Sequence, residues 1–141
     1  MSELPEKLAE IVEDFSLCVG REKLEYLLDL AEQLPPLPTW LEGKRDDMEQ
    51  VHECMSPVFI FAEKQPNNTF SFYFDIPPEA PTVRGFASVL QQGINGSTLA
   101  QIEAVPNEFY LQMGLQSVLT GQRLNGISAI LAHMKTLARE A

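Results

Sequence analysis

Apolar residues recur at helical spacing in the first third of the chain. In the first segment they fall at intervals of three or four, which places them on one face of a helix: Leu4, Leu8, Ile11, Val12 and Phe15. Pro5 suits the first turn, where its missing N–H costs no hydrogen bond. Gly20 ends this helix, and a second apolar face follows it: Leu24, Leu27, Leu28, Ala31 and Leu34. The pattern predicts an N-terminal pair of amphipathic helices.

The centre of the chain changes to a strand pattern. Residues 58–63 are β-branched and aromatic, residues 66–69 read P-N-N-T, and Phe70, Phe72 and Phe74 then alternate with polar residues. This pattern predicts an antiparallel hairpin with one face buried. Before it, the P-P-L-P run at 35–38 predicts an extended connection, Trp40 is expected to be a packed anchor, and the charged segment 42–53 is interpreted as a loop.

The helical period returns after the P-P-E-A-P segment at 77–81. One stripe ends near Asn95, Thr98 and Gln101 have capping-box spacing for a short helix, and another helical segment stops near Gly114. The last helix is expected from about Gln122 to Glu140. The order of elements predicts a single α+β domain over 1–141, with a small antiparallel sheet packed by the N-terminal helix pair and several C-terminal helices.

The excess of acidic residues and the absence of targeting patterns indicate which partners and which compartment to expect. Twenty Asp and Glu oppose ten Lys and Arg, and the formal charge of −10 repels nucleic acid and anionic membranes. The start M-S-E-L-P-E-K has neither a secretory nor a transit-peptide pattern, and no apolar run approaches the roughly 18 residues of a membrane span. We therefore expect a cytoplasmic protein that binds neither nucleic acid nor membrane.

Few residues can carry chemistry. The two cysteines, Cys18 and Cys54, have no C-x-x-C spacing, and in a reducing compartment both should be free thiols. Cys18 falls at the end of the first helix, where an apolar packing role is the default. His52, Cys54 and His133 lack the paired spacing of a zinc site, so no metal is expected. No glycine-rich phosphate loop occurs.

Cys54 is the candidate reactive residue, and two interpretations of it compete. As the nucleophile of a Cys–His hydrolase it would need a base, but His52 lies two residues away on the same face without the required orientation, and His133 is distant in sequence. The acidic residues that precede Cys54 disfavour its thiolate. From these residues alone, a structural and a reactive cysteine both stay open, and the local charges favour the structural one.

Three ordered segments resemble the SufE family over roughly Leu8 to Ala138. The family patterns are V-x-G-C-x-S-x-V-W, D-S-x-A-x-I-V-x-G-L and L-x-x-x-L-T-x-x-R-x-x-G-L. The matching segments here are V-H-E-C-M-S-P-V-F-I at 51–60, F-D-I-P-P-E-A-P-T-V-R-G-F at 74–86 and L-Q-S-V-L-T-G-Q-R-L-N-G-I at 115–127. Two departures lie in the first segment, where Glu53 replaces the glycine before the cysteine and Phe59 replaces the tryptophan.

The resemblance implies a SufE-like fold and a sulfur acceptor rather than a stand-alone enzyme. Cys54 would take sulfur from the persulfide of a PLP-dependent, SufS-like cysteine desulfurase, stimulate that enzyme, and pass the sulfur towards an iron–sulfur scaffold. The PLP belongs to the desulfurase, so no cofactor is expected in this chain. Asp75, Arg123 and Gly126 match the second and third motifs and are expected, with His52, to support the loop or the docking face; Gly85 matches a helix glycine.

Two alternatives remain beside this hypothesis. In the first, the protein is a non-catalytic interaction module that regulates a desulfurase by docking, with Cys54 structural. In the second, it is a thiol hydrolase that depends on His52 or His133.

Overall fold

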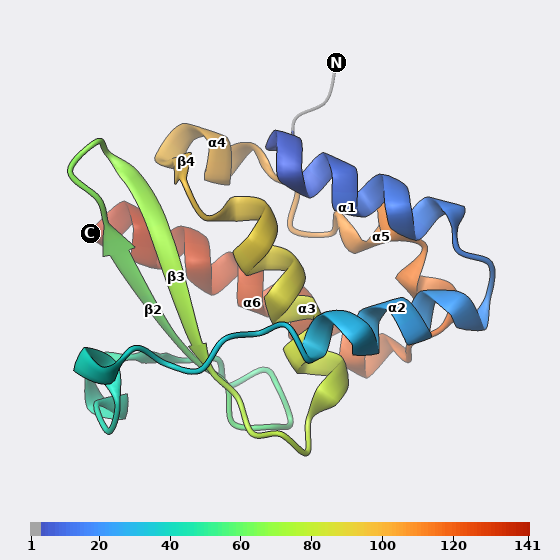
Figure 1. Ribbon diagram of the computed structural model, residues 1–141, viewed down its shortest axis with the longest axis horizontal. Helices are drawn as coiled ribbons and strands as arrows, with labels where there is room; N and C mark the ends of the chain where they lie inside the picture. The colour runs from blue at the N-terminus through green and yellow to red at the C-terminus, as the bar shows by residue number, and fades with distance from the viewer. Residues whose placement is uncertain (1–3) are drawn as a thin grey trace.

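The computed structural model describes residues 4–141, so the predicted domain, 1–141, extends three residues beyond the described range. The fold is α+β, as predicted, with a small sheet at one end of an array of helices (Figure 1). The helices are α1 Glu6–Leu17, α2 Arg21–Ala31, α3 Pro81–Ile94, α4 Leu99–Ala104, α5 Tyr110–Met113 and α6 Gly121–Glu140. The strands are β1 Glu49–Gln50, β2 Phe59–Lys64, β3 Thr69–Asp75 and β4 Ser97–Thr98.

The sheet is antiparallel and its strands follow the chain order β1-β2-β3-β4. The β2–β3 hairpin was predicted, and its register pairs Phe59 with Asp75 and Ile60 with Phe74. The two outer strands were not predicted, and the segment interpreted as a loop, 42–53, in fact contains β1. Each outer strand has only two residues, too few to display an alternating pattern of apolar and polar positions.

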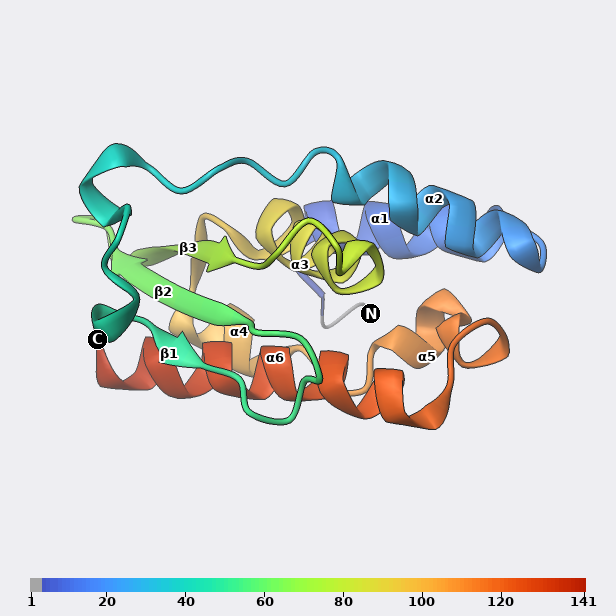
Figure 2. The ribbon, with the colours of Figure 1, turned by 90° about the horizontal axis from the view of Figure 1, so that it is seen from below.

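The inner face of the sheet rests on α3 and α6. Phe70, Phe72 and Phe74 point to this face and are buried, which confirms the predicted stripe. Figure 2 shows α6 running along most of the molecule below β2, with α1 and α2 on the opposite side. On the outer face, Trp40 makes edge contacts with the rings of Phe61 and Tyr73 but stays 46% exposed, so it covers the sheet rather than anchoring a core.

Two glycines let α3 lie unusually close to the N-terminal helix pair. A Cβ at Gly85 would come within 2.3 Å of the Leu27 carbonyl oxygen in α2. A Cβ at Gly93 would come within 2.7 Å of Leu8 in α1. Any larger side chain would therefore push these helices apart, because it would meet backbone atoms: the Leu27 carbonyl oxygen, and the Leu8 Cα at 2.9 Å.

Side-chain amides of the α3 end complete the backbone pairing of β3. The Phe72 N–H donates to Asn95 Oδ1 at 2.8 Å, and Gln91 Nε2 donates to the Phe72 carbonyl at 2.9 Å. Because β4 pairs only with Thr69 and Phe70, the backbone of Phe72 would otherwise lack a strand partner on that side. The amides therefore fix α3 to the sheet.

Candidate functional site

A short loop between β1 and β2 carries the candidate cysteine. The Val51 N–H donates to the Val58 carbonyl at 2.9 Å, and both valine side chains are buried, so residues 52–57 form a loop closed at its base. We call residues 52–57 the Cys54 loop. Its turn is tightened by a hydrogen bond of 3.3 Å from the Cys54 N–H to the Val51 carbonyl. The two valines anchor the loop, while its tip is free of β-sheet pairing.

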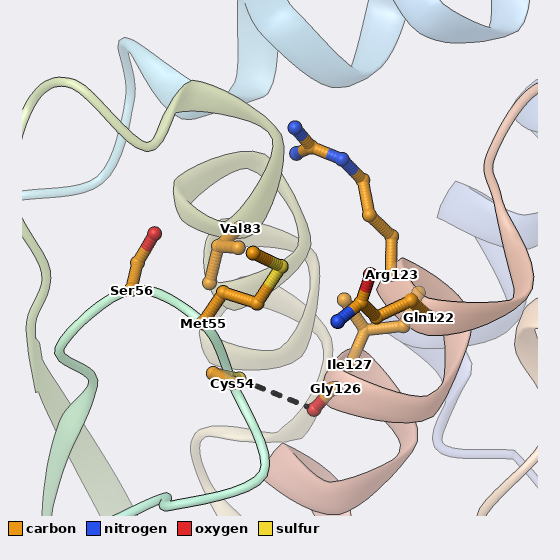
Figure 3. Close-up of a pocket in the computed structure, with 8 residues that line it drawn as sticks. All are labelled: Cys54, Met55, Ser56, Val83, Gln122, Arg123, Gly126 and Ile127. Atoms are coloured by element: carbon orange, nitrogen blue, oxygen red, sulfur yellow. Dashed lines mark hydrogen bonds between the residues drawn. The ribbon is translucent and has the colours of Figure 1, made fainter.

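The sulfur of Cys54 points back from this loop onto α6. Its thiol donates to the carbonyl oxygen of Gly126, with an Sγ to O distance of 3.4 Å (Figure 3). The side chain is half-buried and packs against the main core. Glycine is what permits this contact, because a Cβ at position 126 would lie 3.3 Å from the sulfur.

A pocket of about 180 Å³ opens beside the sulfur. The Cys54 loop supplies residues 54–56, α3 supplies Val83, and α6 supplies the opposite wall, including Arg123 and Ile127. Met55 is 81% exposed, and its side chain reaches across the space between Val83 and α6 (Figure 3). The pocket therefore combines an apolar floor with a polar rim, and the thiol lies at its edge.

The surroundings of the thiol keep it protonated. Burial and, to a lesser extent, the negative charge of Glu53 raise the pKa of Cys54 to about 11. The thiolate is the nucleophilic form of cysteine, so in this position Cys54 is a weak nucleophile at neutral pH. Any reaction at the sulfur therefore requires a change in its environment.

Arg123 lies on the rim of the pocket, in the first turn of α6. The helix starts with Thr120 as its N-cap, whose hydroxyl accepts the Arg123 N–H at 3.3 Å. The guanidinium is exposed and extends away from the sulfur (Figure 3). Within residues 4–141 it has no hydrogen-bond or ion-pair partner, so this cation is available to a molecule that occupies the pocket or covers it.

His133 joins the Cys54 loop to α6, which sequence analysis did not predict. Its Nδ1 lies 2.8 Å from Glu49 Oε2, and its Nε2 lies 2.9 Å from Glu53 Oε1. Burial lowers the pKa of His133, but the bonds to the two carboxylates outweigh this effect and raise the pKa above its ordinary value. Hydrogen bonding to His133 lowers the pKa of Glu53. Both ring nitrogens face carboxylates, so in this arrangement neither serves Cys54 as a base.

Comparison with known proteins places this geometry in a family. The model of the SufE family, described as an Fe-S metabolism associated domain, matches residues 9–138. The chain belongs to the SufE family. A SufE-like protein of Mycobacterium tuberculosis is 44% identical over 98% of this chain and 95% of its own length. The sulfur acceptor protein CsdE of Escherichia coli is 28% identical over 77% of this chain and 71% of its own length.

A solved structure shows the same fold. The solution structure of a hypothetical protein from Thermus thermophilus superposes with a TM-score of 0.85 at 34% identity, covering 98% of this chain and 97% of that one. The α+β architecture is therefore shared over nearly the whole chain.

The other residues matched to SufE motifs lie in different places. Gly126 is at the sulfur, and Gly85 is at the α2–α3 contact. Asp75 lies at the end of β3, outside the Cys54 pocket, and pairs with Arg45 at 2.7 Å. The guanidinium of Arg45 also stacks on the ring of Phe59, 4.6 Å from its centroid. Asp75 therefore holds the segment before β1 against the sheet, and its part in a docking face stays a prediction.

His52 and Glu53 take up positions that the motif alone did not define. His52 is exposed, and its side chain makes no hydrogen bond within the described chain. Its supporting role in the loop therefore stays a prediction. Glu53 replaces the SufE-family glycine without strain, because the only non-glycine residue with a positive φ in the range 4–141 is Asn68.

Residues 4–141 contain neither a metal-binding cluster nor a membrane-spanning helix. No group of three or more His, Cys, Asp or Glu side chains there has an arrangement that could hold a metal ion. No helix in that range is long and apolar enough to cross a membrane.

Proposed function

We propose that this SufE-family protein accepts sulfur on Cys54 from the active-site persulfide of a PLP-dependent cysteine desulfurase. It thereby stimulates the desulfurase and carries the sulfur towards a scaffold on which iron–sulfur clusters are assembled. The observation that carries the proposal is the position of Cys54, whose thiol lies on a loop at the edge of a pocket. Beside it is Arg123, which has no ion-pair partner within residues 4–141. The similarity to a protein named as a sulfur acceptor supports it.

The transfer is a thiol–persulfide exchange that needs no oxidant. The Cys54 thiolate attacks the outer sulfur of the donor persulfide, so a new S–S bond forms on Cys54 as the donor S–S bond breaks. The electron pair of the broken bond leaves with the donor sulfur, which becomes a thiolate. The proton that Cys54 loses passes to solvent or to that departing thiolate, and the number of S–S bonds is unchanged.

The described position of Cys54 corresponds to a resting state. With a pKa of about 11, roughly one thiol in ten thousand is ionised at pH 7, which is too few for efficient attack. Leaving the Gly126 carbonyl and entering the positive surroundings of a docked partner would lower that pKa. The sulfur would thus be sheltered between encounters and reactive during them.

PLP belongs to the desulfurase in this scheme, and this chain supplies only the acceptor thiol and the residues around it. Arg123 would bind an anionic group of the partner at the mouth of the pocket, because its guanidinium is exposed and extends away from the sulfur. It is assigned no proton transfer, because a guanidinium stays protonated at any working pH.

Desulfurase turnover tests the proposal. The production of sulfide or alanine by a desulfurase is measured in the presence of wild type, Cys54→Ser or Cys18→Ser. Cys18→Ser is the matched control, because Cys18 lies at the end of α1. We expect Cys18→Ser to stimulate turnover as wild type does. The stimulation by Cys54→Ser should be at least about tenfold smaller than that by wild type, because no acceptor thiol remains.

A docking module with a structural Cys54 is the second candidate, and the half-buried, strongly protonated thiol favours it. It predicts that Cys54→Ser stimulates turnover as well as wild type, since serine preserves the size of the side chain and a donor to Gly126. Full stimulation by Cys54→Ser would therefore replace the carrier proposal with this one.

A further inference from the structure

Two contacts with α6 hold the Cys54 loop, and they lie about two helical turns apart. The first is the hydrogen bond from the Cys54 thiol to Gly126. The second is His133, seven residues further along α6, which bonds Glu53 beside the cysteine and Glu49 in β1. In Figure 2, β1 and the loop that follows it run alongside α6. Glu49, His133 and Glu53 together form what we call the Glu–His–Glu clamp.

Only a protonated His133 can complete this clamp. Carboxylate oxygens accept hydrogen bonds and donate none, so each of the two contacts requires an N–H on the imidazole. The imidazolium has two N–H groups, whereas neutral imidazole has one. Loss of the proton would therefore leave a ring nitrogen lone pair facing carboxylate oxygen at under 3 Å. One of the two bonds must then break.

We propose that His133 is a positioning residue for Cys54 and that the clamp is a proton-dependent gate on the Cys54 loop. When His133 is protonated, Glu53 is held on α6 and the adjacent sulfur stays withdrawn at Gly126. When His133 loses its proton, the loop is released more often and Cys54 is presented. The role of this gate in sulfur transfer rests on the function proposed above. Its effect on the accessibility of Cys54 is independent of that function.

The charged surroundings of His133 define the direction of the pH effect. Glu49 from β1 and Glu53 from the loop are the charged groups that act on it within residues 4–141, and His52 in turn acts on Glu53. Since the pKa of His133 is raised in the fold, the clamp is complete below the ordinary value of 6.5 and weakens as pH rises through the raised value. Cys54 therefore becomes more accessible on the alkaline side.

The rate at which iodoacetamide alkylates Cys54 tests the gate, measured at pH 6 and pH 9 on the full chain. All variants carry Cys18→Ser, so that Cys54 is the only thiol. The parent is the Cys18→Ser protein. With His133→Ala the clamp is absent, and we expect alkylation at pH 6 to be roughly three- to fivefold faster than in the parent, which corresponds to the loss of a partly exposed ion pair. At pH 9 the two rates should agree within about twofold, because the parent clamp is weakened as well.

Glu53→Gln provides a second, opposite test. Its amide can donate to neutral His133 while the remaining imidazole N–H donates to Glu49, so the clamp stays closed at high pH. We expect this variant to react roughly three- to fivefold more slowly than the parent at pH 9 and within about twofold of it at pH 6. Removing the negative charge beside the sulfur would by itself accelerate alkylation, so a slower rate reports the clamp.

Thr136→Ala is the matched control, since it changes an exposed α6 side chain close to His133 whose hydroxyl bonds the Ala132 carbonyl of the same helix. It should keep the pH dependence of the parent. A ratio of His133→Ala to parent that is the same at both pH values would overturn the proposal. If His133→Ala fails to fold, as judged by circular dichroism, Glu53→Gln decides alone: a rate at pH 9 equal to or above that of the parent rejects the gate.

Discussion

The environment of Cys54 reconciles burial with reactivity at the scale of single residues. The thiol donates to a helix carbonyl at 3.4 Å, and burial raises its pKa to about 11, so the resting sulfur is unreactive. The same residue is reached from the pocket, and its loop is attached by only a few contacts. Gly126 is central to this arrangement, because its missing side chain makes room for the sulfur.

A Gly126→Ala substitution should therefore displace the cysteine. The new methyl group would lie 3.3 Å from Sγ and 3.6 Å from the Cys54 Cα, and the loop can yield more easily than α6. We expect the pKa of Cys54 to fall below about 11 and its alkylation at pH 7 to accelerate roughly two- to fivefold, in proportion to the thiolate fraction.

The matched control for this substitution is Gly121→Ala in the same helix, where a Cβ has no neighbour within 4 Å. It should leave the alkylation rate unchanged. If Gly126→Ala reacts no faster than this control, Gly126 does not determine the position of the sulfur.

Local sequence could identify Cys54 as the candidate but not its partners. Gly126 and Arg123 were associated with it through the family resemblance, since nothing in the spacing shows that α6 lies beneath the loop. His133 was considered as a base and is instead a hydrogen-bond partner of Glu53, 80 residues away in the chain. No periodicity or motif connects such a pair, because their contact exists only after the sheet packs on α6.

At the scale of elements, amphipathic periodicity was sufficient for the long helices and for the β2–β3 hairpin. It failed for β1 and β4, whose pairing depends on where β2 and β3 already lie. It also gave no indication of the distance between helices. That distance is set by Gly85 and Gly93 on α3, and it brings the α1–α2 pair against the helix that supports the sheet.

Gly85→Ala tests this helix contact. The added methyl would lie 2.3 Å from the Leu27 carbonyl oxygen and 2.9 Å from its Cγ, so α2 and α3 must separate. We expect the free energy of unfolding to fall by about 1–3 kcal/mol, the usual cost of overpacking, despite the better helix propensity of alanine. Urea unfolding followed by circular dichroism measures this change.

Gly121→Ala again serves as the control and should change the unfolding free energy by less than about 1 kcal/mol. A Gly85→Ala protein as stable as this control would show that α2 and α3 can separate without loss.

At the scale of the whole molecule, the packed helices and sheet support one short loop that carries the candidate cysteine. The net charge of −10 suits docking to a basic surface. Arg123 is a positive charge at the pocket that no ion pair within residues 4–141 neutralises. The sequence predicted the net charge but not where the charged side chains lie on the surface. Their positions around the pocket depend on how α6 and the Cys54 loop meet.

Sulfur transfer to Cys54 is the central claim, and intact-mass spectrometry measures it directly. The Cys18→Ser and Cys54→Ser proteins are each incubated with a cysteine desulfurase and cysteine, and then analysed without reductant. We predict that Cys18→Ser gains the mass of one sulfur atom, which dithiothreitol removes, and that Cys54→Ser gains none. Equal sulfur gain on Cys54→Ser, or no gain on Cys18→Ser while the desulfurase turns over, would contradict the account.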